Sequence, residues 1–166
     1  MTVSAWIRDQ NVSLLVSPPT SAGVTTLSWS TNPELPALPW GDRLPVLLIL
    51  GIGLSLTTAG GGSARRVKIS VVGPAFDGTN LSTVTWNGSG TQNAGQTRRH
   101  EFAAGLSFDT TLVPGQMFRD ALPSGLYLLP GSASPGSGTL TVSIENWVAG
   151  SDSYPNITVT GRLFPL

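Results

Sequence analysis

The sequence predicts an all-β fold, an antiparallel β-sandwich or jelly-roll-like arrangement of about eight to ten strands with extended Pro/Gly-rich arms. Two observations support this prediction. Short segments that alternate apolar and polar residues recur between turn signals along the 166-residue chain, which contains 20 Gly and 13 Pro, and this spacing is typical of sandwiches and barrels. In addition, no stretch of about ten residues shows apolar positions at helical spacing without an interrupting Gly or Pro.

The clearest strands are a hairpin in the middle of the chain. Residues 67–72 and 81–86 alternate in polarity, and Gly73-Pro74 and Asp77-Gly78 lie between them, where they favour a turn. Near the C-terminus, residues 139–144 and 157–163 alternate in the same way, as half-buried antiparallel strands do. Weaker strand candidates are residues 12–16, 24–29, 101–103, 110–113 and 126–129, while residues 116–122 are expected to form one helical turn at most.

A long uncharged run between Arg43 and Arg65 raises the question of a membrane span. A spanning helix needs about 20 consecutive apolar residues, but residues 44–56 are fewer than this and include Pro45, Gly51 and Gly53, which interrupt a helix. The aliphatic residues 46–50 are therefore predicted to form a strand covered on both faces, at the centre of a sheet or at a subunit contact.

The length is typical of one domain, so residues 1–166 are predicted to form a single β-sandwich domain. Residues 31–42 are expected to be an arm or long loop, because they carry three prolines. The same segment holds Leu35, Leu38 and Trp40. Apolar residues in an extended loop need to cover something, either the edge of their own domain or a neighbouring molecule.

Charge and cysteine content exclude several classes of function. The formal net charge is zero, which predicts no general attraction to nucleic acid or to anionic membranes. The chain has no cysteine, so disulfides, thiolate metal sites and cysteine nucleophiles are excluded. Its first residues also lack the pattern of a secretory signal, so synthesis in the cytosol is expected.

No residue cluster predicts an enzyme, a cofactor or a metal. His100 is the only histidine and lies in an Arg-Arg-His-Glu run that is expected to be an edge strand with charged faces, although a triad with Asp109 and a serine stays open. One histidine without cysteine does not supply a zinc site. Gly60-Gly61-Gly62 lacks the ending of a phosphate-binding loop and is predicted to connect two strands. A glycosidase with paired carboxylates and a site that binds a cation through carboxylates also stay open as alternatives. The candidate ligands of the cation are Asp77, Asp109, Asp120 and Asp152.

Residues 67–95, with the sequence VKISVVGPAFDGTNLSTVTWNGSGTQNAG, resemble a layout found in virion proteins of tailed bacteriophages. The shared features are a strand ending in glycine, an Asp-Gly turn, a Thr-rich return strand and a short Asn-Gly segment. The resemblance implies a non-enzymatic structural protein, made in the host cytoplasm and assembled on the virion. A capsid decoration (cement) subunit that binds the major capsid protein as a small cyclic oligomer, with a trimer favoured, is the preferred form.

The predicted interface is a set of apolar residues in the arms and at the C-terminus: Trp6, Leu35, Leu38, Trp40, Leu163, Phe164 and Leu166. Two alternatives remain within this prediction, a tail or connector protein and a carbohydrate-binding β-sandwich. The latter would use tryptophans as a sugar-stacking platform, although tryptophan also serves as a core or interface anchor. The chain contains five: Trp6, Trp29, Trp40, Trp86 and Trp147.

Overall fold

The computed structural model describes residues 10–16, 18–28, 45–74, 81–88, 90–104, 117–122, 126–128 and 138–165. Within these ranges the chain is all-β, as the sequence predicts, and it contains no helix. Ten strands are described: β1 (Gln10–Val16), β2 (Val24–Ser28), β3 (Pro45–Thr57), β4 (Arg66–Pro74), β5 (Leu81–Asn87), β6 (Thr97–Ala104), β7 (Met117–Leu122), β8 (Tyr127–Leu128), β9 (Thr139–Glu145) and β10 (Ile157–Pro165).

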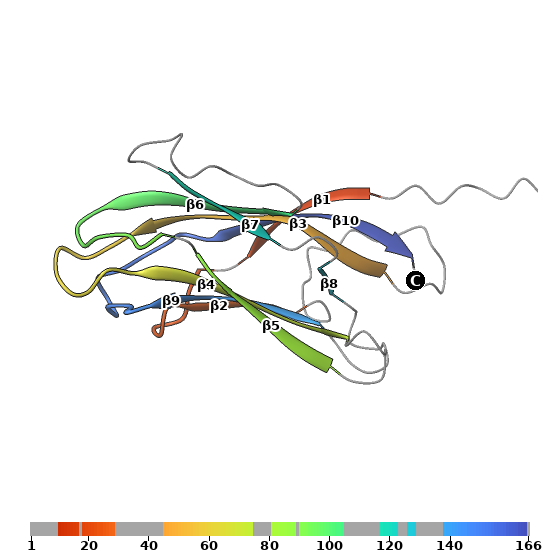
Figure 1. Ribbon diagram of the computed structural model, residues 1–166, viewed down its shortest axis with the longest axis horizontal. Helices are drawn as coiled ribbons and strands as arrows, with labels where there is room; N and C mark the ends of the chain where they lie inside the picture. Colours follow the sequence, from red (N-terminus) through yellow and green to blue (C-terminus); the bar gives the residue numbers. More distant parts are fainter. Residues whose placement is uncertain are drawn as a thin grey trace, which may run out of the picture.

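The strands form two sheets that lie face to face (Figure 1). Sheet A has the order β1-β10-β3-β6-β7, with β8 paired to β3, and sheet B has the order β2-β9-β4-β5. Every described pairing is antiparallel except that of β6 with β7, which is parallel. The sequence therefore predicted the sandwich, but it gave no sign of the parallel edge.

The strand order identifies the sandwich as a jelly roll. If β7 and β8 are set aside, four strands belong to each sheet, and the chain changes sheet at every step along these eight strands except from β4 to β5. Eight strands wound in this way between two sheets are the double Greek key of the jelly roll. The β4–β5 step is the predicted hairpin, with Ile69 opposite Trp86 and Val71 opposite Val84.

Alternate residues of both sheets fill the space between them. In β4 and β9 every second side chain is buried, which gives two inward rows of three aliphatic residues opposite one another. The inward residues of β3, β10 and β6 join the same hydrophobic cluster. Burial of one such side chain typically contributes about 1.5–3 kcal/mol, so this core is the main source of stability. The rows from sheet B are Val67, Ile69, Val71, Leu140, Val142 and Ile144.

The uncharged run forms β3, a 13-residue strand at the centre of sheet A. No helix in the described part of the chain is long and apolar enough to cross a membrane. The expectation that both faces of the run are covered is wrong within this chain. Leu47 and Ile49 are buried, but Leu48 is only partly buried and Leu50 is 41% exposed. One face of β3 therefore belongs to the core and the other looks outward.

Two local predictions are also wrong. Residues 117–122, expected to form a helical turn at most, form strand β7. Every residue of β7 pairs with a residue of β6. His100, expected on an edge strand, lies in β6 between β3 and β7 and is 1% exposed. The strand predicted at residues 110–113 lies outside the described residues.

Candidate interaction surface

The two outer faces of the sandwich differ in chemistry. The outer face of sheet B carries mainly hydroxyl and charged side chains that bond to one another. Thr26 bonds to Thr141 at 3.3 Å, and Ser70 bonds to Thr85 at 2.6 Å. A third pair, the ion pair of Lys68 with Glu145, spans 3.1 Å. A strand face of this kind is typical of the solvated side of an antiparallel sheet.

The outer face of sheet A is mixed, because it carries exposed apolar side chains among polar ones such as the hydrogen-bonded pair of Thr57 and Thr97. Among the described residues, the large hydrophobic side chains that remain exposed are Leu15 at 54%, Leu50 at 41% and Tyr127 at 38%. All three lie on sheet A, and each has a buried residue next to it in its strand, namely Leu14, Ile49 and Leu128. Large exposed hydrophobic side chains on one face are a mark of a contact surface when they form one patch.

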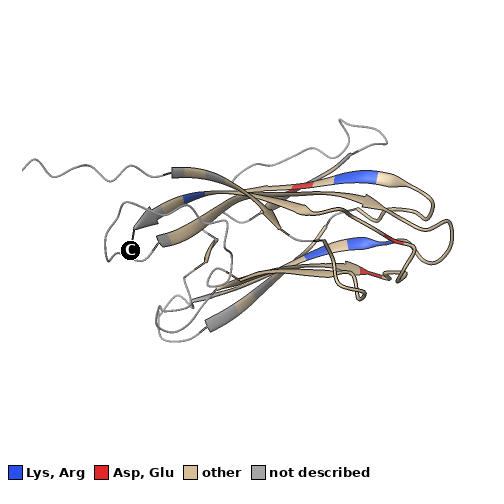
Figure 2. Cartoon of the chain, turned by 180° about the vertical axis from the view of Figure 1, so that it is seen from behind, with Lys and Arg blue, Asp and Glu red and all other residues tan. Residues whose placement is uncertain are grey.

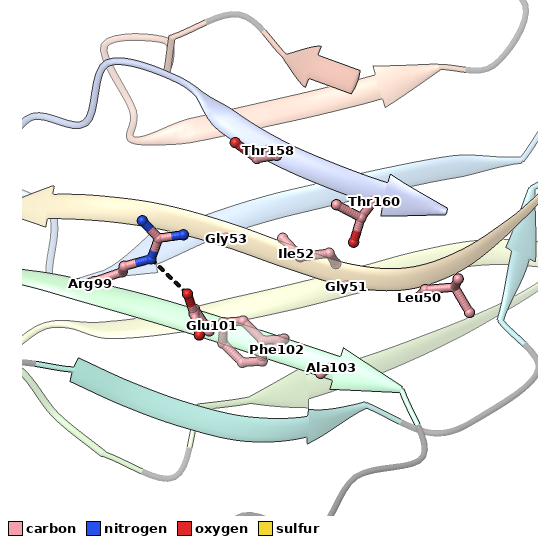
Figure 3. A pocket seen from close by; sticks show the side chains of 10 residues that line it. All are labelled: Leu50, Gly51, Ile52, Gly53, Arg99, Glu101, Phe102, Ala103, Thr158 and Thr160. Carbon is pink, nitrogen blue, oxygen red and sulfur yellow. Dashed lines mark hydrogen bonds and ion pairs between the residues drawn. The ribbon is translucent and has the colours of Figure 1, made fainter. Parts of the chain in front are cut away.

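A shallow hollow of about 230 Å³ lies in the middle of this face, over β10, β3 and β6 (Figure 3). Its floor is low because Gly51 and Gly53 have no side chain and because Ala103, which pairs with Gly51, has a small one. The complete lining is Leu50, Gly51, Ile52, Gly53, Arg99, Glu101, Phe102, Ala103, Thr158 and Thr160.

A β-bulge at Leu50 shapes the hollow. Gly51 pairs with Thr160, and Ile49 pairs with Gly161, so Leu50 has no partner on β10. A bulge inserts one extra residue and redirects the side chains beside it, which explains why Leu50 stands out of the sheet although it belongs to an apolar run. A Cβ at Gly51 would lie 2.7 Å from the Thr160 hydroxyl oxygen, so a larger residue there would force the Thr160 side chain to move.

Two charged side chains, Arg99 and Glu101, belong to the lining of the hollow. Arg99 Nε donates to Glu101 Oε1 at 2.7 Å, and the two side chains are 59% and 30% exposed. An exposed pair of this kind contributes little to stability. Figure 2 shows that the other described charges are sparse and gather mostly toward the end of the sandwich that carries the β3–β4 connection, called the loop end below.

No protein-family model matches this chain. No curated protein matches it either. Similarity is found only with solved structures. One is a chain of Desmodium yellow mottle tymovirus, with 10% identity and a TM-score of 0.38; the alignment covers 100% of this chain and 93% of that chain.

Two further similar chains come from infectious bursal disease virus. For the Gx strain the identity is 14% and the TM-score 0.28, and for the T13 viral particle they are 13% and 0.24. Both alignments cover 96% of this chain, but only 41% and 40% of the viral chains. This chain thus spans less than half the length of either. Likenesses this weak do not establish a shared function.

The loop end of the sandwich holds a buried ion pair. Arg65 donates from Nε and Nη2 to the two carboxylate oxygens of Asp152, both at 2.9 Å, and neither side chain is exposed. Asp152 also accepts the backbone N–H groups of Ala59 and Val148. Burial by itself would raise the pKa of Asp152, but these hydrogen bonds and the charge of Arg65 outweigh burial and hold the pKa below its usual range.

The glycine loop next to Arg65 does not form an anion cradle. The carbonyl oxygens of Gly61 and Ser63 accept hydrogen bonds from Arg65 at 2.9 and 2.6 Å. The loop thus directs acceptors at a cation, whereas a phosphate-binding loop directs N–H donors at an anion. As predicted, the loop connects two strands, β3 and β4.

His100 is buried in the core, and Asp109, the acid considered for a triad with it, lies outside the described residues. Its Nε2 lies 2.9 Å from Gln92 Oε1, and its ring stacks on Phe118 at 4.7 Å. Gln92 uses its own N–H groups on carbonyl oxygens, so its Oε1 accepts from Nε2–H of a neutral imidazole. Burial lowers the pKa of His100 to about 4, and the charge of Asp120 opposes this shift. The described residues show no group of three His, Cys, Asp or Glu that could hold a metal ion.

Most of the predicted interface residues lie outside the described part of the chain, namely Trp6, Leu35, Leu38, Trp40 and Leu166. Phe164 is placed in β10, but its side chain is not described. Leu163 is 0% exposed and belongs to the core cluster, so its side chain is used within the fold and is not available to a partner.

The two tryptophans that the structure describes do not form a platform for a sugar. Trp86 and Trp147 are partly buried and pack against the core. Trp147 also donates from Nε1 to the carbonyl oxygen of Ser21 and meets Tyr154 edge to face. Both therefore act as anchors within the domain.

Proposed function

We propose that this chain is a non-enzymatic structural subunit of a virus particle, and that it assembles through the outer face of sheet A. The observation that supports the proposal is the contrast between the two outer faces. Sheet B presents paired hydroxyl groups, while sheet A presents the exposed side chains of Leu15, Leu50 and Tyr127 and a hollow lined in part by Leu50. A solvated face needs no partner, but exposed apolar side chains are stabilised when a partner covers them.

The architecture is compatible with this role. Jelly rolls build viral shells, lectin domains and cupins, so fold alone does not choose among them. The described residues give no support to a metal-centred cupin or to a sugar platform, because His100 and the described tryptophans are used in packing. A shell subunit requires only a rigid body and a contact surface, and this chain offers both.

The low content of charged residues is also compatible with a protein that is buried in an assembly. Charged residues make up 11% of the chain, against about a quarter in ordinary soluble proteins. The cores of protein interfaces are depleted of charge in the same way. Copies repeated around a shell gain avidity from many weak contacts, so a modest apolar face is sufficient.

The more specific form of the proposal is a capsid decoration (cement) subunit of a tailed bacteriophage. In this form residues 1–166 make one domain, the subunit is synthesised in the host cytoplasm, and a small cyclic oligomer, preferably a trimer, binds the major capsid protein. A shell-building subunit is the closest alternative. The two differ in one property, because a decoration subunit needs a preformed shell and a shell builder does not.

The sizes of the species in solution test both the general proposal of a virion subunit and its specific form as a decoration subunit. We expect sedimentation velocity of the purified chain to show a stable oligomer, and we expect the chain to co-sediment with capsids from the same source. Closed particles formed by the chain alone would favour shell building over decoration. A chain that stays monomeric at all concentrations and binds no capsid protein would overturn the proposal.

A further inference from the structure

We infer that β1 of one copy pairs with β1 of a second copy, antiparallel and about a two-fold axis, so that the two A sheets join into one continuous sheet. The contact uses the edge of sheet A rather than its outer face. It therefore goes beyond the proposed function and does not depend on it. The features of β1 that support the inference are its open edge, its lack of charge and an alternation that matches its own reverse.

β1 lies at one edge of sheet A. All seven of its residues pair with β10 without a break in register, and no other described strand pairs with it. Backbone N–H and C=O groups of an antiparallel strand are directed to its two sides in alternation. A row of these groups on β1 therefore points away from β10, and such a row is a template for a further strand.

β1 lacks the features that usually protect an edge strand, which are a charged residue, a proline or a bulge. Its sequence is QNVSLLV, and its pairing with β10 is regular. The opposite edge of sheet A is protected, because β7 contains Arg119 and Asp120. The open edge of β1 is thus a property of this strand and not of the whole sheet.

The edges of sheet B are less suited to a contact. β2 has only five residues. β5 is as long as β1, but it exposes the hydroxyl side chains of Thr83 and Thr85. Among the edge strands whose side chains are described, β1 alone combines seven uncharged residues with a large exposed apolar side chain, that of Leu15 at 54%.

The alternation of β1 matches its own reverse. Leu14 and Val16 are buried, while Asn11, Ser13 and Leu15 are exposed. Residues directly opposite one another in an antiparallel pair lie on the same face, so an axis at Ser13 keeps buried positions opposite buried ones. In this register every residue of β1 has a partner, Ser13 meets Ser13 of the second copy, and Leu15 meets Asn11. A shift by one residue would turn the buried side chains outward.

A second copy is the occupant that this edge tolerates best. When identical strands pair antiparallel, a charge near the axis meets its own like charge, which is destabilising. β1 avoids this cost because it is uncharged. On the neighbouring β10, Arg162 is opposite Asn11 and thus lies away from the axis. The contact is also closed, because a two-fold pair uses the same edge of both copies.

Charge exchange at the axis tests the contact in the full-length chain. Ser13→Lys places like charges opposite one another, so sedimentation velocity should show a dimer weakened by about fivefold, the upper end of what one cross-strand pair contributes. Ser13→Glu should do the same, and an equimolar mixture of the two variants should associate more tightly than either alone. No recovery in the mixture, or a wild type that stays monomeric at all concentrations, would overturn the inference.

Thr26→Lys is the matched control for this experiment. Thr26 is an exposed hydroxyl residue on β2, an edge strand of sheet B. The substitution therefore adds the same charge to an edge that the inference leaves unused, and association should be unchanged. An equal loss in the control would indicate general repulsion and would overturn the assignment to β1.

Crosslinking tests the register. Since the chain contains no cysteine, Ser13→Cys should give a disulfide-linked dimer under mild oxidation. Leu15→Cys alone should not, because the two copies of this residue lie about 13 Å apart along the strands. A mixture of Leu15→Cys with Asn11→Cys should link one copy to the other. Leu15→Cys dimers that form more readily than Ser13→Cys dimers would overturn the axis at Ser13.

Hydrogen exchange shows whether the edge is open in a single copy. The β1 amide groups that point away from β10 should exchange rapidly at low protein concentration and slowly at high concentration. Equal protection at every concentration would mean that the edge is covered within one chain, and it would overturn the inference.

These outcomes are separate from those of the proposed function. If the chain binds capsids but Ser13→Lys and Ser13→Glu associate as the wild type does, this contact is wrong and the proposed function stands. If the dimer forms but the chain neither builds nor binds a shell, the contact stands and the proposed function fails.

Discussion

Arg65 and Asp152 form a bidentate ion pair in which both N···O distances are 2.9 Å. The pair joins the β3–β4 connection to the β9–β10 connection at the loop end of the sandwich. Arg65 donates further to two carbonyl oxygens of its own loop. Asp152 in turn accepts two backbone N–H groups. The pair therefore replaces the hydrogen bonds that these loops would otherwise make with water.

Removing one partner of this pair should be strongly destabilising. Asp152→Asn or Arg65→Met leaves a buried charge without compensation, which typically costs about 3–5 kcal/mol. Denaturant unfolding should therefore show a lower midpoint for either variant. Arg65→Met combined with Asp152→Asn should be less damaging than the sum of these two single changes, and full additivity would contradict the pairing.

Acid should weaken the fold through His100. Its pKa is about 4 in the folded protein and 6.5 in the reference state, so the unfolded chain binds the proton more tightly and stability falls as the pH is lowered from 6.5 to 4. The difference corresponds to about 3 kcal/mol. His100→Gln keeps an N–H donor near Gln92 but does not titrate. Its free energy of unfolding should lack this dependence, and an equal pH slope in both proteins would contradict the assignment.

Asp152 should make the stability of the fold depend on pH in a more acidic range than His100 does. Because its folded pKa is depressed below the reference value of 3.8, its contribution is present above that pH and is lost as the pH falls through the folded value. Acid titration of the wild type and of Asp152→Asn separates this effect from that of His100. The variant should be less stable at neutral pH and should approach the wild type in strong acid, whereas a constant difference would contradict the prediction.

Two glycines of sheet A, Gly161 at the bulge and Gly53 beyond it, differ in their tolerance of a side chain. A Cβ at Gly161 would lie 2.5 Å from the Leu48 carbonyl oxygen and 2.6 Å from Leu47 Cδ1, while a Cβ at Gly53 meets nothing closer than 3.9 Å. Gly161→Ala should therefore lower stability by about 1–3 kcal/mol. Gly53→Ala should be neutral or slightly stabilising, because glycine weakens a strand. Thermal unfolding of the two variants checks the ranking.

Charges placed on sheet A should block assembly without unfolding the subunit. Leu15 and Leu50 are 54% and 41% exposed, so Leu15→Asp and Leu50→Asp give up about half of a leucine's burial and should lower stability by about 1–2 kcal/mol. Each should reduce the oligomeric fraction in sedimentation experiments at a temperature where circular dichroism shows that the subunit is folded. Thr83→Asp on sheet B is the control. An equal loss of assembly in that control would indicate general charge repulsion rather than a contact surface.

Much of the fold was predictable from the sequence, because alternation determines which residues of a strand are buried. The hairpin of β4 and β5 and the strands β9 and β10 follow from it directly. β7 was missed because Met117–Leu122 does not alternate in a simple way and acquires its strand conformation from pairing with β6. His100 was misplaced for a related reason, since charged neighbours suggested an edge before β7 was known to cover it.

The site was less predictable than the fold. The glycines in the run after Leu50 were visible in the sequence as obstacles to a helix, and a glycine within a strand also marks a bulge or a close approach. What the sequence does not contain is the register that sets Gly51 beside Ala103 and Thr160. A hollow made of neighbours from three strands becomes apparent only when their pairing is known.

The hydroxyl-rich outer surface of sheet B has a consequence for any layer made of these subunits. If each copy is held through sheet A, all copies turn the same threonine-covered side to the surrounding water, and the layer acquires a defined outside and inside. Thr83 and Thr85 are exposed on that side. Fluorophores or affinity tags coupled at these two positions would all lie on the outer surface of the layer, and they would show which way the subunits face.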